Sequence, residues 1–378
     1  MKKEEEKEKI FSNSQWISYD REFYAKRGKF VNKKFSQWLS SSTQNSEWIM
    51  AKIFFLLLAM CISLHGDIEE HLKKAHAKSD NHGIRNIDFI YMINLDQRPE
   101  KWNLSSGQFA PYGIHPYRFS AVNGWELTLE TIHDVGVTYS PEMQGGFWAT
   151  TFRLKREGES SVPEMKEGSC GCSYPFNGNF IWEQERIQNY GTVYFGHCTE
   201  RGTIGIALSH ISVLNDAFES GYETIWVMED DIEVVRDPRI LSDLIDQLDR
   251  MVDKDWDILF TDKDIRDNKG EYVPAAAAAK RPDFVSPNDF TMNQLISHDL
   301  RRIGARYGAH SMILRKKGIK KLLQFFKAHQ IFLPYDMEYT LPPNIKLYTV
   351  LEDVVTNLRN GLSDNGHPRY LEKQTLKY

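Results

Sequence analysis

The chain has 378 residues, of which 41% are hydrophobic and 12% aromatic. This length and composition allow one large domain or two ordinary ones with a substantial core. The formal net charge is −5 and the isoelectric point is near 6.2. Nucleic-acid binding is therefore not expected, because a duplex partner favours a basic surface.

The N-terminal part differs from the rest of the chain. Residues 1–49 are polar and we expect them to form a poorly ordered extension. Residues 50–66 contain the uncharged apolar run Ile53–Leu64, whose 12 residues fit a signal peptide behind Met50 and Lys52. A bilayer span would need roughly 20 residues.

We therefore interpret residues 50–66 as a signal-like or membrane-anchor segment. This interpretation predicts an exported or membrane-associated protein, with the cytoplasmic face of the inner membrane as the alternative. It also allows residues 1–49 to lie upstream of the true start. The competing interpretation is a buried or interfacial helix within a longer N-terminal region.

Residues 67–378 show apolar runs of strand length alternating with helical patterns. The expected strands are Asp88–Asn94, Tyr117–Val122, Thr224–Met228, Trp256–Thr261, Ala309–Leu314 and Lys346–Val350. The expected helices are 65–87, Pro99 to about Tyr112, Gly202 to about Gly221, Ile240–Met251 and Lys316–Phe326. This alternation predicts an α/β fold over about 88–365, with a mostly parallel central sheet flanked by helices.

Two stretches lack this regularity. Residues 125–200 read as an insertion of loops and short elements, which often carries specificity, and 262–293 as a mobile loop. The insertion holds Cys170, Cys172 and Cys198. A zinc site formed by these thiols and the histidine at position 197 is conceivable, but the spacing matches no standard zinc pattern, so structural or free thiols are the main expectation.

Three consecutive carboxylates, Glu229, Asp230 and Asp231, end the apolar strand Thr224–Met228. Side chains alternate along a strand, so Glu229 and Asp231 point the same way. Hard oxygen ligands suit Mg²⁺ or Mn²⁺, and a metal held there could hold a diphosphate. Acidic residues after a strand are more often a solvated turn or a helix cap, but packed like charges call for a neutralising cation.

Other polar side chains follow other strands, where open α/β sheets bind their ligands. Asn94, Asp96 and Arg98 follow the first strand, and guanidinium suits phosphate oxygens, although Arg98 could also be a surface residue. His210 lies in the helix that begins near Gly202, where a lone histidine is more often structural. Asp262 and Asp264 follow a later strand, and Asp336 follows an apolar stretch, where a helix N-cap is the plain interpretation.

These motifs, taken together, resemble glycosyltransferase family 25, which includes lipooligosaccharide galactosyltransferases and collagen hydroxylysine galactosyltransferases. The resemblance runs from about Phe89 to Asp364, with 125–200 poorly matched. The segments that carry it, in order, are Ile93-Asn-Leu-Asp-Gln-Arg98, Gly202-Thr-Ile-Gly-Ile-Ala-Leu-Ser-His210, Met228-Glu-Asp-Asp-Ile232, Pro334-Tyr-Asp336 and Leu362-Ser-Asp364. The chain departs from the family pattern at Gln97, Thr203 and Ile206.

The resemblance implies a GT-A-like fold, a UDP-sugar donor, usually Mn²⁺, and inversion at the anomeric carbon. It implies that Glu229 and Asp231 hold the metal. A larger group would serve the donor or its loop: Asn94, Asp96, Arg98, His210 and Asp230.

Inversion needs a carboxylate that takes the proton of the acceptor hydroxyl. Asp336 is our first candidate for this base, with Asp262 or Asp264 next. The expected activity is transfer of a sugar, with galactose the family's commonest donor sugar, to a glycan or protein hydroxyl. A non-catalytic nucleotide-sugar or glycan-binding protein of the same fold is the alternative, and a metal-dependent phosphoesterase is a weaker one.

Overall fold

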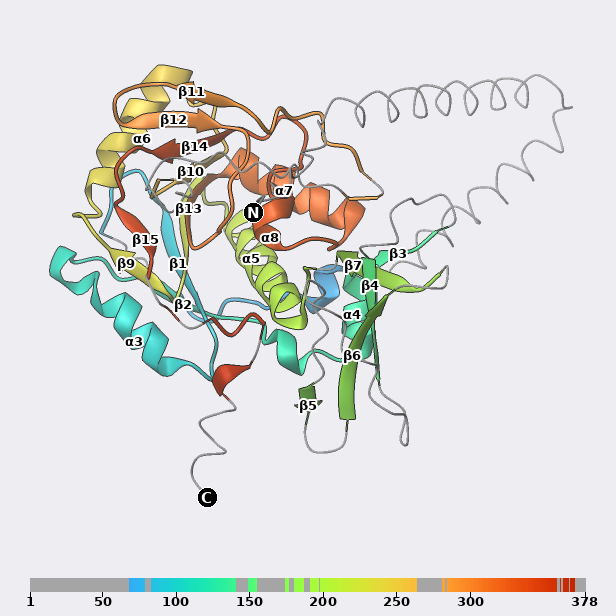
Figure 1. Cartoon of the computed structure of the whole chain (residues 1–378). Coiled ribbons are helices and arrows are strands. Elements are labelled where there is room, and N and C mark those ends of the chain that lie inside the picture. The colour runs from blue at the N-terminus through green and yellow to red at the C-terminus, as the bar shows by residue number, and fades with distance from the viewer. Residues whose placement is uncertain are drawn as a thin grey trace, which may run out of the picture. The chain divides into compact units, whose positions relative to one another are not determined.

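The structure, a computed structural model (Figure 1), describes residues 68–78, 83–140, 149–154, 174–176, 180–186, 191–196, 198–263, 281–282, 284–358, 361, 363–366 and 368–370. The chain divides into two compact units, Met1–His65 and Gly66–Tyr378, of which the second contains every described residue. The predictions for 1–49 and 50–66 lie outside the described residues. No helix in the described part of the chain is long and apolar enough to cross a membrane.

A sheet of eight strands forms the centre of the second unit, in the order β11-β12-β14-β10-β13-β8-β1-β2. The strands in chain order are β1 (Phe89–Asn94), β2 (Tyr117–Ser120), β8 (Thr224–Glu229), β10 (Ile258–Phe260), β11 (Asn293–Leu295), β12 (Leu300–Ile303), β13 (Ser311–Arg315) and β14 (Leu347–Val350). The pairings make β12 and β13 antiparallel to their neighbours, so the other six strands share one direction. The predicted α/β fold with a mostly parallel sheet is confirmed.

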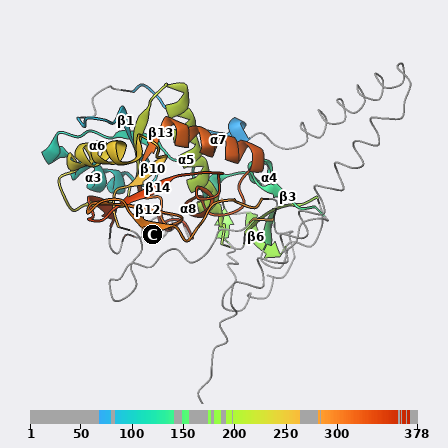
Figure 2. The ribbon, with the colours of Figure 1, turned by 90° about the horizontal axis from the view of Figure 1, so that it is seen from above.

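Helices cover both faces of this sheet (Figures 1 and 2). They are α3 (Pro99–Gly107), α5 (Arg201–Glu219), α6 (Ile240–Val252), α7 (Lys316–His329) and the short α8 (Tyr335–Glu338). Alternate residues of the central strands enter two separate cores. In β8, Val227 packs in the core that α5 and α7 complete, and Trp226 packs in the core that α6 completes. Burial on both faces explains why these strands are almost continuously apolar.

The insertion at 125–200 forms more regular structure than expected. It contains the helix α4 (Leu129–Val135) and a five-stranded antiparallel sheet in the order β3-β7-β4-β6-β5. Its strands are β3 (Val137–Thr138), β4 (Ala149–Leu154), β5 (Tyr174–Phe176), β6 (Phe180–Arg186) and β7 (Val193–Gly196). β7 joins this sheet to the main domain, because the backbone N–H of Gly196 donates to the carbonyl of Phe332 at 2.7 Å and Phe195 is fully buried in the main core.

The helix expected over 65–87 does not form across that stretch. Only the 3-10 helix η1 (Ile68–His71) is present, and 79–82 lie outside the described residues. The following residues are not helical, and polar groups of the domain bind them: the Lys73 amide donates to the Ser212 hydroxyl at 2.9 Å, and the Lys78 ammonium bonds Asp216 at 2.7 Å. These long-range contacts outweigh the local preference for a helix.

The loop expected over 262–293 is only partly described. Residues 264–280 and 283 lie outside the described residues. After it, β11 and β12 form a hairpin that extends the edge of the main sheet and that the sequence pattern did not predict. The last small element is a two-stranded antiparallel pair of β9 (Ile232–Val234) and β15 (Val355–Asn357).

Candidate active site

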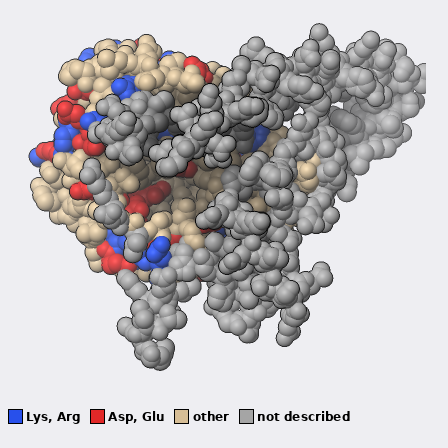
Figure 3. Space-filling model, viewed as in Figure 1, with Lys and Arg blue, Asp and Glu red and all other residues tan. Residues whose placement is uncertain are grey.

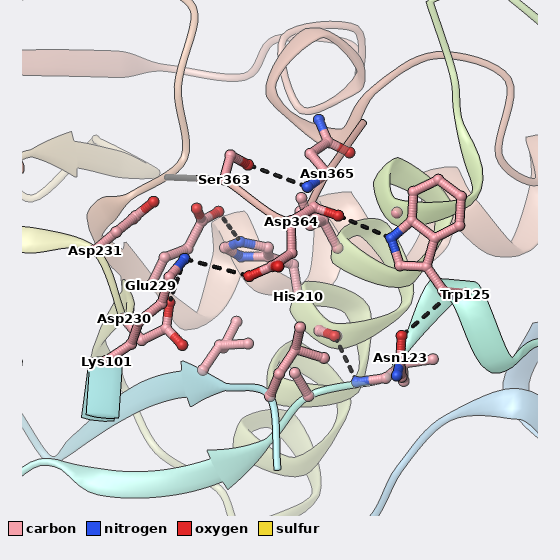
Figure 4. Close-up of a pocket in the computed structure, with 18 residues that line it drawn as sticks. Lys101, Asn123, Trp125, His210, Glu229, Asp230, Asp231, Ser363, Asp364 and Asn365 are labelled. Atoms are coloured by element: carbon pink, nitrogen blue, oxygen red, sulfur yellow. Dashed lines mark hydrogen bonds and ion pairs between the residues drawn. The ribbon is translucent and has the colours of Figure 1, made fainter. Parts of the chain in front are cut away.

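The acidic triplet lies at the carboxyl end of β8, where it lines a pocket of the main domain (Figure 4). The pocket is bounded by the segments that follow β1 and β2, the first turns of α5, the end of β8 and the segment 363–365. Acidic side chains gather near the middle of the face shown in Figure 3.

Two glycines let α5 approach the pocket loops closely. A Cβ atom at Gly205 would lie 2.5 Å from the backbone nitrogen of Gly124 and 2.7 Å from the carbonyl oxygen of Val122. A Cβ atom at Gly202 would lie 2.1 Å from the carbonyl oxygen of Asn365. Since real Cβ atoms do not make such contacts, the Gly-x-x-Gly spacing in this helix serves the close packing of backbone around the pocket.

Glu229 is bound to the buried His210. The Nε2 atom of His210 lies 2.9 Å from a carboxylate oxygen of Glu229, and the His210 ring stacks on Tyr335 with centroids 4.3 Å apart. Burial acts to raise the pKa of Glu229, but the hydrogen bond and charge of His210, with the charges of His310 and Lys101, outweigh it, so the pKa lies below its usual value. Glu229 is therefore held as a carboxylate.

The pKa values of Asp230 and Asp231, in contrast, are raised. Burial, with the charges of the neighbouring carboxylates, raises the pKa of Asp230 to about 7. Burial and the charge of Glu229 also raise the pKa of Asp231. The backbone carbonyl of Asp231 accepts a hydrogen bond from the Leu358 amide at 2.6 Å. No side chain of the described residues donates a hydrogen bond to the Asp231 carboxylate. A carboxylate pair of this kind is stabilised by a bound cation.

Asn94 holds Asp230 of the triplet through hydrogen bonds of its side-chain amide. Its amide group donates to Asp230 at 2.5 Å and to the carbonyl of Arg98 at 2.9 Å, and its oxygen accepts a hydrogen bond from Arg118 at 2.7 Å. Asn94 is 1% exposed and does not line the pocket. Its place indicates a supporting role for the loop rather than direct contact with a nucleotide.

Arg98 and Asp96 also lie outside the pocket lining. The Arg98 guanidinium is buried and lies 3.4 Å from the Asp364 carboxylate and 3.1 Å from that of Glu100. Asp96 is exposed, accepts a hydrogen bond from Ser120 at 2.7 Å and pairs with Arg118 at 3.0 Å. Of the sequence candidates for the donor site, the pocket lining contains only His210 and Asp230.

The two candidate bases differ in their surroundings. The Asp262 carboxylate is 4% exposed and is bonded by Arg306, His310 and Thr356 at 3.0, 2.8 and 3.0 Å. Asp336 is the second residue of α8, is partly exposed, and accepts a hydrogen bond from the Gly308 amide at 2.9 Å. Neither lines the pocket, and Asp264 lies outside the described residues.

Burial, with the nearby Glu229 charge, raises the pKa of Asp336. The charges of Glu229 and His210 both act on the Asp336 carboxylate, which is consistent with a place near the triplet.

Sequence reasoning missed Lys101, His310 and Trp125. Lys101 lies in the first turn of α3, and none of the sequence motifs includes it. His310 precedes a strand, and in a fully parallel sheet it would lie at the opposite edge, but β13 is antiparallel to β8 and pairs Ser311 with Met228. Trp125 donates its ring N–H to the Asp364 carbonyl at 2.8 Å and so ties the pocket wall to the segment 363–365.

The described residues contain no group of three or more His, Cys, Asp or Glu side chains arranged to hold a metal ion. Glu229 and Asp231 would therefore supply two ligands of an open site. This suits Mg²⁺ or Mn²⁺ bound by one or two carboxylates together with substrate phosphates and water. Of the proposed zinc ligands, Cys198 is a free thiol and the others lie outside the described residues.

A flanked, mostly parallel α/β sheet with an acidic pocket at the carboxyl end of a central strand is compatible with a GT-A-like fold. Residues 87–339 match the sequence profile of glycosyltransferase family 25, described as LPS biosynthesis protein. The chain belongs to glycosyltransferase family 25.

Two insect proteins, each named glycosyltransferase 25 family member, are similar to parts of the chain. The one from Aedes aegypti is 27% identical over 138 residues, which are 36% of this chain and 19% of that protein. The one from Drosophila melanogaster is 37% identical over 75 residues, which are 20% of this chain and 12% of that protein. The aligned segments thus span a fifth or less of these relatives.

Proposed function

We propose that this chain transfers a sugar, galactose in the first instance, from a UDP-sugar to a hydroxyl of a lipooligosaccharide-type glycan or protein acceptor, with inversion and with the help of a divalent metal. The observation that carries the proposal is the pair Glu229 and Asp231 at the end of β8, in a pocket of a family 25 domain. Glu229 and Asp231 would hold Mn²⁺ or Mg²⁺. The metal would stabilise the negative charge of the departing diphosphate.

Asp336 is the base that the geometry favours. Among the described residues, three side chains (Arg306, His310 and Thr356) already donate hydrogen bonds to the Asp262 carboxylate, which leaves little room for a substrate hydroxyl. The Asp336 carboxylate is partly exposed and accepts a hydrogen bond from the Gly308 backbone amide. In an inverting transfer the acceptor oxygen attacks the anomeric carbon while its proton passes to the base, and the bond to the diphosphate breaks.

The acceptor would bind beside the antiparallel sheet of the insertion. β7 of this sheet bonds the segment at Phe332, four residues before Asp336. Membrane association through 50–66 would bring a glycolipid acceptor to the same enzyme.

The test of metal and donor is a panel of UDP-sugars assayed for UDP release with Mn²⁺ or with EDTA. We expect release from one or few donors with Mn²⁺, and its loss with EDTA. Asp231→Asn should lower the Mn²⁺-dependent rate at least about 100-fold, since it removes an oxygen ligand charge. Asp243→Asn, an exposed residue of α6 paired with Arg85 and outside the pocket, serves as the matched control. UDP binding without turnover of any donor or acceptor would instead support a binding protein.

The test of the base is the kinetics of Asp336→Asn. We expect kcat to fall by about 100- to 10,000-fold while UDP affinity changes little. The base works only when ionised, and its pKa is raised above the ordinary 3.8. In the wild type the acidic limb of the kcat profile should therefore lie above pH 3.8. A variant with near-normal kcat would remove Asp336 as the base.

A further inference from the structure

Lys101 occupies an unusual place for a helical lysine. It lies in the first turn of α3, directly after the loop that follows β1, and its side chain lines the pocket. Helical side chains lean toward the N-terminus of their helix, and here this direction leads to the carboxyl edge of the sheet. The side chain is 15% exposed and points among the acidic residues (Figure 4).

The ammonium of Lys101 forms only long contacts with these acids. It lies 3.9 Å from the carboxylate of Asp230 and 3.6 Å from that of Asp364. Both distances exceed hydrogen-bond length, and no hydrogen bond joins this ammonium to another described residue. Its three donors are therefore available to a ligand in the pocket.

The carboxylate of Asp364, the acid nearer to Lys101, is also incompletely hydrogen-bonded. The Asp364 carboxylate is buried beside Arg98 and Lys101, and its Oδ2 atom has no hydrogen-bond partner. Arg98 donates a hydrogen bond from Nη1 to the other oxygen of Asp364, Oδ1, at 3.4 Å, and its Nε atom lies 3.1 Å from the Glu100 carboxylate. Buried polar groups are normally hydrogen-bonded. The Asp364 Oδ2 atom, 3.6 Å from Lys101, is therefore an incompletely satisfied acceptor, although Oδ1 is bonded by Arg98.

We propose that Lys101 binds the diphosphate of the nucleotide donor, and that Asp364 holds its ammonium at the pocket wall until the donor enters. The contact between Lys101 and Asp364 is then exchanged for one between Lys101 and a phosphate oxygen. The inference rests on the proposed function and adds to it a second cationic contact for the diphosphate, beside the metal pair.

The charge balance of the pocket supports this assignment. Among the described residues that line it, Lys101 is the only lysine or arginine, beside four carboxylates. A diphosphate entering such a pocket needs positive charge in addition to a metal ion held by two of those carboxylates. Arg98 does not reach the pocket lining, so Lys101 is the side chain that can supply it.

The experiment measures the affinity of the whole chain for UDP and for UMP by calorimetry, with Mn²⁺ and with EDTA. Lys101→Met should weaken UDP binding about 10- to 30-fold, the loss of one charge-assisted hydrogen bond, and should weaken UMP binding much less. Lys101→Arg should restore most of the UDP affinity. Lys316→Met, which removes an exposed lysine paired with Glu223, is the matched control.

The outcomes separate the two proposals. Wild-type protein that neither binds UDP nor releases it from a UDP-sugar contradicts the proposed function. Wild-type protein that does both, while Lys101→Met keeps the wild-type ratio of UDP to UMP affinity, contradicts the role of Lys101 alone. A folded Lys101→Met protein, judged by an unchanged unfolding transition and measurable UMP binding, makes either result decisive.

Discussion

The ionisation of Asp230 opposes the folded state. Its proton stays bound up to about pH 7 in the folded protein, whereas in the unfolded chain it leaves near 3.8. The folded state therefore binds more protons in this interval, so stability is highest below pH 3.8, falls as pH rises toward 7, and is constant above it. The ionised Asp230 carboxylate therefore lowers the free energy of unfolding of the metal-free protein at neutral pH.

Asp230→Asn should therefore stabilise the metal-free protein at pH 8 and hardly change it at pH 4. At 1.36 kcal/mol per pH unit the interval corresponds to about 4 kcal/mol at most, and Asn can still accept the hydrogen bond from Asn94. Urea unfolding at the two pH values measures the difference.

Asp96→Asn is the matched control for this measurement. Burial acts to raise the pKa of Asp96, but the Ser120 hydrogen bond and the Arg118 charge outweigh it and lower the pKa. Its ionised form is thus favoured in the folded state, and that stability is present above the unfolded pKa and lost as pH falls. A stabilisation of Asp230→Asn that is equal at both pH values would contradict the ionisation argument.

At the scale of elements, α5 combines strong burial with two glycines that a free helix would disfavour. Gly205→Ala would gain about 1 kcal/mol of helix propensity, but its Cβ would meet the backbone at Gly124 and Val122. We expect a net loss of about 1–3 kcal/mol in the free energy of unfolding, together with a raised KM for the donor, because those loops line the pocket.

Gly107→Ala in α3 is the matched control for the helix prediction. A Cβ atom there meets nothing within 4 Å, so the variant should be neutral or slightly stabilised. Chemical denaturation of both variants compares them directly. Equal stabilisation of both would show that α5 does not approach the pocket loops as closely as described.

The elements that could be predicted from the sequence are those whose buried residues form a local pattern of apolar side chains. β1 and β8 are apolar on both faces, and α5 carries its core residues at helical spacing. The acidic triplet could be placed because it follows such a strand. Family 25 membership, suggested by motifs, is confirmed by the match over 87–339.

What sequence could not supply depends on contacts between distant segments. The direction of β13 decides where His310 lies, and no local pattern records it. Asn94 looked like a ligand residue, yet both ends of its amide are used by Arg98, Asp230 and Arg118. The place of Lys101 in the pocket is recognised only from its contacts with Asp230 and Asp364, which lie 129 and 263 positions later in the sequence.

At the scale of the whole molecule, the described core residues lie between Ile68 and Tyr370, within the compact unit Gly66–Tyr378. A chain that begins at Gly66 should therefore fold cooperatively and release UDP at the rate of the full chain. If residues 50–66 attach the protein to membranes, the shortened chain should also lose flotation with lipid vesicles. Loss of cooperative unfolding would contradict the assignment of the fold to 66–378.

The reversal of β13 has a consequence for how this domain tolerates change. In an open sheet whose strands share one direction, the connections at one edge shape the site and those at the other edge only hold the fold together. Here the segment before β13, with Gly308 and His310, belongs to the functional edge, whereas the turn after it, which opens α7 at Lys316, does not. Scanning the chain with short insertions should find residues 304–310 sensitive in catalysis, and the turn at 315–316 sensitive only in stability.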